Sequence, residues 1–220
     1  MEYKRITLLC GHYGSGKTNI ALNMAYEIKN SYENVAIADL DIVNPYFRTT
    51  DSAKDLKEKG IKLIASEYAG SNVDIPALPQ EMYSLTDDKT VRAVIDVGGD
   101  DRGALALGRI SPQIMAENDY EAFLVINKYR PLTPDVASTL EVMAEIESAG
   151  NFKFTGIINN SNLGVETTAA DVLNSSEYAQ GVADATGLPL VATSVDEKLF
   201  NELSDKINNL FALKLQKKIN

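Results

Sequence analysis

The sequence has 220 residues and a net charge of -10, from 21 Lys and Arg against 31 Asp and Glu. We do not expect a chain this acidic to bind DNA or RNA through a broad basic face. One Cys and one His exclude a disulfide framework and argue against Cys-rich or His-based metal sites within one chain. The chain starts without a signal-peptide pattern and lacks a run of about 18 apolar residues, so we expect a cytoplasmic protein.

Short β-rich runs alternate with longer helical stretches along the chain. The expected strands are 5–10, 34–40, 61–66, 91–97, 121–127, 153–159 and 188–194, and the expected helices are 17–30, 104–117, 134–149, 166–186 and 197–217. Most of the strands are almost continuously apolar, as expected when helices cover both faces of a parallel sheet. The pattern predicts a single three-layer α/β domain over residues 1–220, with a mostly parallel sheet. Residues 67–90 are expected to be a long, less regular connection, with a short helix inside it as one possibility.

The last expected helix, 197–217, is amphipathic and ends in lysines. A basic amphipathic helix can lie on an anionic membrane surface. We favour a helix that covers the sheet instead, because the fold needs a helix after its last strand. Lysines in a last turn also complement the helix dipole.

The first expected strand leads into the sequence GHYGSGKT, residues 11–18. Gly11, Gly16, Lys17 and Thr18 match the phosphate-loop pattern G-x-x-x-x-G-K-[ST], and the flanking strand and helix disfavour a chance match. Glycines let backbone N–H groups face phosphate oxygens, and the following helix adds its N-terminal dipole. Lys17 is expected to reach the β- and γ-phosphates, and Thr18 to bind Mg²⁺. The other expected nucleotide-binding residues of this stretch are Gly14, Ser15 and Asn19.

Carboxylates follow two further strands at the edge where parallel α/β sheets bind ligands. Asp39 and Asp41 end the second strand, and Asp96 ends the fourth. Asp96 also begins a D-x-x-G pattern whose Gly99 is expected to contact the γ-phosphate. These acids would repel a nucleotide unless Mg²⁺ bridged them, so the sequence implies Mg²⁺. The alternative for each Asp is a turn or helix-capping role.

The three motifs GHYGSGKT, ADLD and VIDVGGD occur in the order that is typical of one superfamily. In this combination the sequence resembles the MinD/ParA/CobQ-type P-loop proteins from residue 5 to about 195. The resemblance implies a Rossmann-like sheet, Mg-ATP binding, often slow hydrolysis and often a nucleotide-dependent homodimer. It also implies that Asp41 orients the attacking water, and that Asp39 and Asp96 lie near the Mg²⁺.

The base is predicted from the residues after the fifth and sixth strands. Asn127 and Lys128 match the guanine-reading pattern N-K-x-D, but Arg130 stands where the Asp would be. Without that acceptor, the N1–H and N2–H₂ donors of guanine would remain unpaired, which favours adenine. The resemblance implies that an Asn after the next strand contacts adenine. Asn159 is the first candidate and Asn160 the second, and a plain turn asparagine is the alternative.

His12 and Tyr13 depart from the family pattern, in which the loop reads K-G-G-x-G-K-[ST]. In the family, the first Lys reaches across a dimer interface to the partner's nucleotide. His is shorter and mostly neutral at pH 7. We therefore expect that mechanism to be absent, with either no face-to-face dimer or another cation, such as Arg48, in its place. Alternatively, His12 and Tyr13 simply pack on the outside of the loop.

The sequence therefore predicts an ATP hydrolase that acts as a nucleotide switch on a protein partner, with Lys17 and Asp41 as catalytic residues and ATP and Mg²⁺ as cofactors. One alternative is a small-molecule kinase or a synthetase of the dethiobiotin-synthetase type, with a substrate pocket built from 44–48 and 67–90. Another is a nucleotide-binding module that does not hydrolyse ATP. No nucleic-acid or membrane partner is expected.

Overall fold

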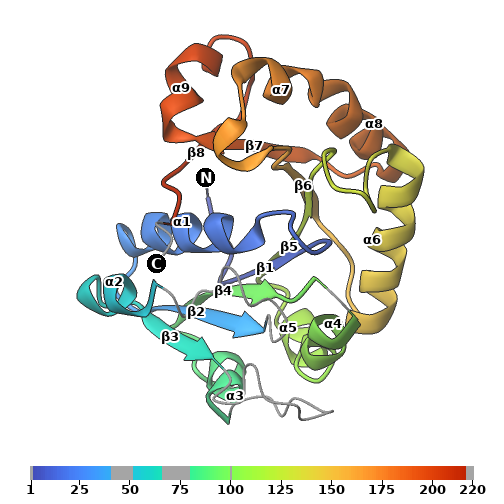
Figure 1. Cartoon of the computed structure of the whole chain (residues 1–220). Helices are drawn as coiled ribbons and strands as arrows, with labels where there is room; N and C mark the ends of the chain where they lie inside the picture. The colour runs from blue at the N-terminus through green and yellow to red at the C-terminus, as the bar shows by residue number, and fades with distance from the viewer. Residues whose placement is uncertain (1, 41–51, 66–79, 100, 217–220) are drawn as a thin grey trace, which may run out of the picture.

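The computed structural model describes residues 2–40, 52–65, 80–99 and 101–216. Within these ranges eight parallel strands form one sheet in the order β3-β2-β4-β1-β5-β6-β7-β8 (Figure 1). The strands are β1 (Ile6–Cys10), β2 (Val35–Leu40), β3 (Lys62–Ala65), β4 (Arg92–Val97), β5 (Tyr120–Ile126), β6 (Gly156–Asn159), β7 (Leu190–Asp196) and β8 (Leu210–Leu213). The helices are α1 (Lys17–Lys29), α2 (Ala53–Glu58), α3 (Gln80–Asp87), α4 (Asp101–Leu107), α5 (Ser111–Glu117), α6 (Val136–Gly150), α7 (Ala169–Asn174), α8 (Ser176–Thr186) and α9 (Glu197–Leu203).

Helices cover both faces of the sheet, which confirms the predicted three-layer α/β architecture. Successive residues of β1 pack into different apolar clusters: Leu8 belongs to the cluster that includes α4, α5 and α6, and Leu9 belongs to the cluster of α1. Figure 1 shows α1 on one side of the sheet and α4 and α5 on the other. Because side chains alternate along a strand, a strand buried on both faces must be apolar throughout.

The predicted strands agree with the structure to within about three residues, whereas several helices differ. The stretch 104–117 contains two helices. Helix α4 ends just before Gly108, and Pro112 lies in the first turn of α5. The stretch 166–186 is also two, because Ser175 ends α7 and its hydroxyl donates to the Val172 carbonyl. Helix α2 was not predicted, and α3 occupies the end of the connection predicted as irregular.

The predicted helix at 197–217 is wrong. Helix α9 ends at Leu203, and the chain turns through Asn209, a residue with a φ of 57°. The apolar residues that follow then pair with β7 as an eighth parallel strand, which buries Leu213. Pairing satisfies the backbone groups that β7 would otherwise leave open at the sheet edge. Helix α9 follows β7 and buries Leu203 in one apolar cluster with Val195, but the described residues after Leu203 do not continue the predicted amphipathic helix.

The segment after β8 crosses α1. The Lys214 N–H donates to the Asn23 side-chain oxygen at 3.0 Å, and the Asn23 amide donates back to the Lys214 carbonyl at 3.1 Å. Two residues on, the Gln216 N–H donates to the Asn19 side-chain oxygen at 2.9 Å, and the Gln216 amide donates to the Ser52 hydroxyl at 2.8 Å. The end of the sheet is thereby joined to the helix that follows the phosphate loop. None of the described helices has the length and apolar character needed to cross a bilayer.

Candidate nucleotide site

The phosphate loop connects the central strand β1 to α1 and lies close to the end of β5. A Cβ added to Gly11 would lie 2.3 Å from the Val125 carbonyl oxygen, so only glycine fits there. Gly16 has a φ of 90° and caps α1 from a left-handed conformation, which again favours glycine. The Ser15 N–H donates to the His12 carbonyl at 3.1 Å and closes the turn. The sequence match is therefore a folded loop ahead of a helix N-terminus.

Lys17 lies within this loop. Its ammonium donates to the Gly11 carbonyl at 2.9 Å and to the His12 carbonyl at 3.4 Å, and the residue is buried. A buried cation needs such acceptors, because burial without them is costly. The Ser15 hydroxyl is also buried and has no hydrogen-bond partner among the described residues. The loop thus presents a cation and a buried hydroxyl, both of which suit anionic oxygens.

Thr18 and two of the predicted acids meet beside the loop. The Thr18 hydroxyl donates to an Asp96 carboxylate oxygen at 2.7 Å. Asp39 and Asp96 are register partners on the neighbouring strands β2 and β4, and both are buried. Two carboxylates and a hydroxyl are the oxygen donors that Mg²⁺ prefers, with phosphate and water completing the shell. These residues therefore fit a Mg²⁺ ion.

The structure does not place Asp41, the second predicted acid after the second strand. Asp41 and Arg48 both lie outside the described residues. Within the described ranges, no three His, Cys, Asp or Glu side chains gather as a metal site. A Mg²⁺ site here would accordingly depend on nucleotide oxygens in addition to protein oxygens.

The D-x-x-G segment packs directly against the phosphate loop. A Cβ added to Gly99 would lie 2.5 Å from the Tyr13 nitrogen and 2.7 Å from the Tyr13 Cα. On its other side the segment touches α4, where a Cβ added to Gly103 would lie 2.6 Å from the Gly98 nitrogen. Glycines therefore allow three backbones to meet at this point. A shift of the D-x-x-G segment would press on the phosphate loop, and the reverse also holds.

His12 and Tyr13 lie at the outer turn of the loop. The His12 ring nitrogen Nδ1 lies 3.0 Å from the Tyr13 carbonyl oxygen, and the Tyr13 side chain is exposed. The imidazole thus contacts its own loop. This arrangement agrees with the alternative that His12 and Tyr13 pack on the outer surface of the loop.

Asn159, the first predicted adenine contact, is held inside the protein. Its amide donates to the Ser175 hydroxyl at 2.9 Å, and its oxygen accepts from the Ser161 N–H at 3.1 Å and from the Ser161 hydroxyl at 2.7 Å. Asn160 instead reaches the phosphate loop, where its amide donates to the Ser15 carbonyl at 2.6 Å. The second candidate is therefore the one that the structure brings next to the predicted site.

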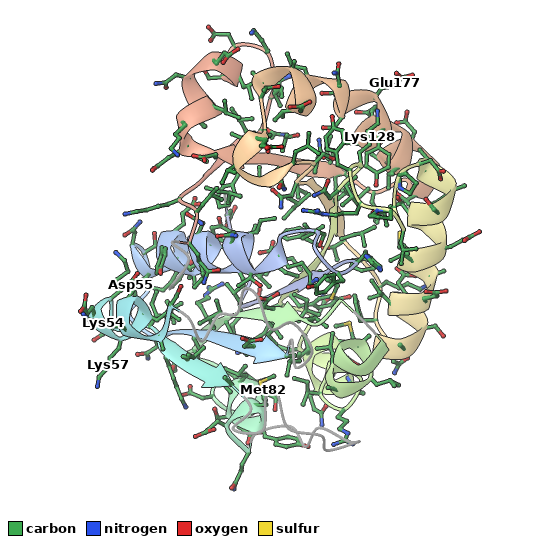
Figure 2. All side chains as sticks on the ribbon, viewed as in Figure 1. Lys54, Asp55, Lys57, Met82, Lys128 and Glu177 are labelled. Atoms are coloured by element: carbon green, nitrogen blue, oxygen red, sulfur yellow. The ribbon has the colours of Figure 1, made fainter. Side chains whose placement is uncertain are left out.

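The N-K-x-R segment after β5 lies on the same side of the site. The Asn127 oxygen accepts from the N–H groups of Tyr129 and Asn162, at 3.0 and 3.3 Å, and shapes the turn. The Lys128 ammonium donates to the Asn174 carbonyl at the end of α7, and Figure 2 shows Lys128 beside α7 and α8. Arg130 extends to the phosphate loop, where its Nε donates to the Gly14 carbonyl at 2.7 Å. No local sequence pattern indicates this contact, which joins residues 116 positions apart.

Two other residues near the loop have roles within the protein. Asn19, a predicted nucleotide contact, uses its side-chain oxygen to accept from Gln216, as described above. Cys10 is fully buried at the end of β1, and burial raises the pKa of its thiol. The nearby Asp96 carboxylate also raises this pKa, whereas the Lys17 ammonium lowers it. Cys10 is therefore a neutral core residue and an unsuitable nucleophile.

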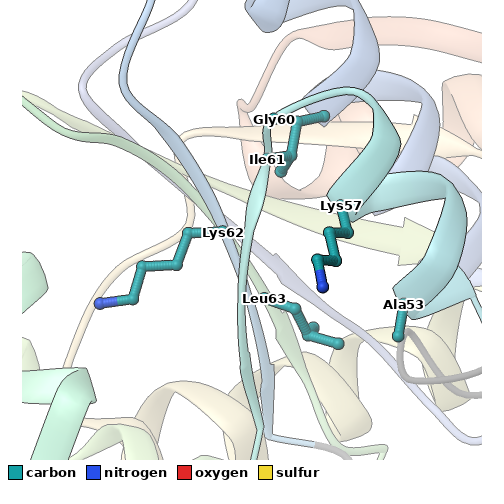
Figure 3. Close-up of a pocket in the computed structure, with 6 residues that line it drawn as sticks. All are labelled: Ala53, Lys57, Gly60, Ile61, Lys62 and Leu63. Atoms are coloured by element: carbon teal, nitrogen blue, oxygen red, sulfur yellow. The ribbon is translucent and has the colours of Figure 1, made fainter.

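A pocket elsewhere in the structure contains none of these residues. It lies between α2 and the edge strand β3 (Figure 3). Its lining residues are Ala53, Lys57, Gly60, Ile61, Lys62 and Leu63. It carries two lysines and no carboxylate, so it does not compete with the phosphate loop as a Mg-nucleotide site.

The sequence matches no family model and no curated protein. Among solved structures, it is similar to the cell division protein FtsY from Thermotoga maritima, with a TM-score of 0.56 at 20% identity, over 87% of this chain and 62% of that chain. It is also similar to chloroplast FtsY from Physcomitrella patens, with a TM-score of 0.57 at 17% identity, over 90% and 60%. A third similar structure is the signal recognition particle 54 kDa protein from Aeropyrum pernix K1 in complex with GDP, with a TM-score of 0.53 at 16% identity, over 87% and 41%.

These similarities establish the fold alone. The chain spans about three-fifths of the two FtsY chains and about two-fifths of the 54 kDa protein. The shared fold is a three-layer α/β fold with a parallel sheet, as the sequence predicted. The narrower resemblance to the MinD/ParA/CobQ type is not decided by these structures.

The contact between Gly99 and Tyr13 predicts a functional effect of a single methyl group. Gly99→Ala places a Cβ against the Tyr13 backbone and should push the two segments apart. We expect nucleotide affinity, measured by calorimetry, to fall by about tenfold, as for overpacking that costs about 1–3 kcal/mol. Tyr13→Ala is the matched control: because the three atoms nearest to the added Cβ are backbone atoms and the Tyr13 side chain is exposed, this change should leave affinity unaltered. A Gly99→Ala protein with wild-type affinity would contradict the prediction.

Proposed function

We propose that this protein binds Mg-ATP, hydrolyses it and acts as a nucleotide switch on a protein partner. The observation that carries the proposal is the meeting of Lys17, Thr18 and Asp96 at the turn between β1 and α1, with the Thr18 hydroxyl 2.7 Å from the Asp96 carboxylate. The P-loop fold supports it, because this turn is where such a fold binds phosphates.

Different groups of the loop would bind different parts of a triphosphate. Lys17 would donate to the β- and γ-phosphates in place of its present carbonyl acceptors, and the loop N–H groups would cradle the remaining oxygens. Thr18, Asp39 and Asp96 would hold Mg²⁺. When bound, Mg²⁺ neutralises phosphate charge and stabilises the charge that develops during transfer. The protein's own contribution is then to position and orient the groups that meet the phosphates.

Hydrolysis and switching involve two further residues. By its resemblance to the MinD/ParA/CobQ type, Asp41 would orient the attacking water. The Gly99 N–H would donate to the γ-phosphate and move with it. The close approach of Gly99 to the Tyr13 backbone supports a mechanical link between the D-x-x-G segment and the phosphate loop. Loss of the γ-phosphate would release that segment, which is the form of signal that a partner protein can detect.

The choice of adenine rests on Arg130. A similar structure, the 54 kDa protein, was solved with GDP, so a guanine nucleotide must be considered. Here the fourth position of the N-K-x-D pattern holds a guanidinium that has only donors and is directed to Gly14. Such a group offers no acceptor to the N1–H and N2–H₂ of guanine. We propose that the bound base is adenine, with Asn159, the last residue of β6, as the residue that would contact it.

The phosphate-loop assignment predicts the effect of removing Lys17. Lys17→Ala should lower Mg-ATP affinity at least about tenfold, because hydrogen bonds to charged groups contribute about 1.5–3 kcal/mol. Isothermal calorimetry measures the affinity, and thermal melting without nucleotide checks that the fold is intact. Lys29→Ala, at the opposite end of α1, is the matched control and should bind as the wild type does. ATP affinity that Lys17→Ala leaves unchanged would refute the proposed function.

Base preference is tested by competition. A fluorescent ATP analogue bound to the wild-type protein should be displaced by ATP at about tenfold lower concentration than by GTP, the effect of leaving at least one buried donor unpaired. Inorganic tripolyphosphate serves as the control that has no base. Stronger displacement by GTP than by ATP would overturn the adenine assignment while leaving the phosphate site in place.

The His12 position predicts that turnover does not depend on a cation donated by a second subunit through this residue. His12→Ala should keep the ATPase rate per subunit within about twofold of the wild-type rate, because the imidazole is shorter than the Lys of the family pattern and contacts the Tyr13 carbonyl of its own loop. The rate is measured against protein concentration without added metabolite, alongside sedimentation with a non-hydrolysable ATP analogue. An ATP-induced dimer whose activity collapses in His12→Ala would show that His12 has kept the family role. Hydrolysis that requires an added metabolite would indicate a kinase or synthetase.

A further inference from the structure

Two side chains from distant parts of the chain hold successive carbonyl groups of the phosphate loop. The Arg130 Nε donates to the Gly14 carbonyl at 2.7 Å, and the Asn160 amide donates to the Ser15 carbonyl at 2.6 Å. Arg130 follows β5 and Asn160 follows β6, which are neighbouring strands. These two residues stand where the sequence suggested base recognition. The structure directs both of them to the backbone of the loop.

Holding a carbonyl also orients the next N–H. A trans peptide unit is planar, and its C=O and N–H point in opposite directions. Asn160 holds the Ser15 carbonyl, so the Gly16 N–H must face the opposite side of that peptide plane. Gly16 is the residue that caps α1, and its N–H is among those that a bound phosphate would require. Arg130 holds the preceding peptide unit, between Gly14 and Ser15, whose N–H donates to the His12 carbonyl and closes the turn of the loop.

The loop is built to admit both side chains. A Cβ added to Gly16 would lie 2.1 Å from the Asn160 amide nitrogen, so any other residue there would displace Asn160. A Cβ added to Gly14 would lie 3.3 Å from the Arg130 Nε, which is also tighter than usual contact. Two glycines of the motif are therefore needed for contacts on the outside of the loop, in addition to any contact with phosphate.

Asn160 is itself rigidly placed. Its side-chain oxygen accepts from the Ser194 hydroxyl on β7 at 2.8 Å, and its backbone N–H donates to the Ile126 carbonyl at 2.9 Å. The residue is 4% exposed. Arg130 is half-buried, and its backbone N–H donates to the Asn127 carbonyl at 3.2 Å. Both donors thus belong to the ends of the sheet strands, so they hold the loop against a rigid support.

We propose that Arg130 and Asn160 are positioning residues that set the peptide planes of the phosphate loop for a polyphosphate ligand. The inference rests on the proposed function and deepens it. Because these residues act through the loop, their effect should be the same for a nucleotide and for a polyphosphate without a base. A base-recognition role would instead affect only the nucleotide.

The test compares two ligands on the same variants. Asn160→Ala, Arg130→Ala and Arg130→Lys are titrated by calorimetry with Mg-ATP and with Mg-tripolyphosphate. Each alanine variant should lose both ligands by about the same factor, about threefold to tenfold for one hydrogen bond of about 0.5–1.5 kcal/mol. Arg130→Lys keeps a donor and should recover part of the loss. Exposed residues of the same types supply the matched controls, Asn201→Ala and Arg109→Ala, which should bind both ligands as the wild type does.

The outcomes separate this inference from the function on which it rests. A loss of ATP affinity with tripolyphosphate affinity unchanged would show base recognition and overturn the inference. If the alanine variants bind both ligands as the wild type does, whether or not they melt at a lower temperature, the two contacts only stabilise the fold, and the inference is overturned as well. If Asn160→Ala does not fold, the Arg130 pair decides the question alone. A wild-type protein that binds neither ligand would refute the proposed function itself.

Discussion

The position of β1 between β4 and β5 is the constraint on which the rest of the site depends. Parallel pairing places the ends of these strands at one edge of the sheet, so that Leu9 is the register partner of Asp96 on β4 and Cys10 that of Leu124 on β5. The phosphate loop must leave β1 at this edge, where it meets the carboxylate on one side and the Val125 carbonyl on the other. A central strand has little freedom to shift, because a shift would break its pairing with β4 and with β5 at the same time. The position of the phosphate loop is therefore set by the sheet.

The part of this arrangement that depends on local pattern could be predicted from the sequence. Continuous apolar runs predicted the strands of the parallel sheet up to β7, and the phosphate-loop motif predicted the turn after β1. Asp39 and Asp96 could be placed at the same edge of the sheet because both lie at the ends of buried strands, whereas the pairing of those two strands is seen only in the structure. The boundaries of the helices from α4 to α8 were harder to predict from the sequence, because single capping residues such as Ser175 decide them. The strand β8 was missed because its apolar residues also fit a helical period, and only the open edge of β7 favours a strand.

Contacts between distant residues could not be predicted in the same way. Asn159 and Asn160 are adjacent, and side chains alternate along a strand, so only the packed structure shows which of them faces the loop. Arg130 could be interpreted from the sequence only as the loss of a carboxylate. Its contact with Gly14 depends on how the turn after β5 bends, which Asn127 controls through two backbone N–H groups. Polar side chains that bond to a distant backbone produce no periodic sequence pattern. A motif therefore identifies the residues that contact a ligand more easily than the residues that hold the loop in place.

The separation of these contacts along the chain has a consequence for synthesis on the ribosome. The glycine-rich loop is translated early, but its supports Arg130 and Asn160 follow 116 and 145 residues after their partners. Until β4 and β5 have emerged, the apolar strand β1 has two open edges, a condition that favours misassociation. A nascent chain that stops before Asn160 would carry the complete motif without a properly shaped loop. The loop would take its final shape only when the strands that carry its two supports have joined the sheet.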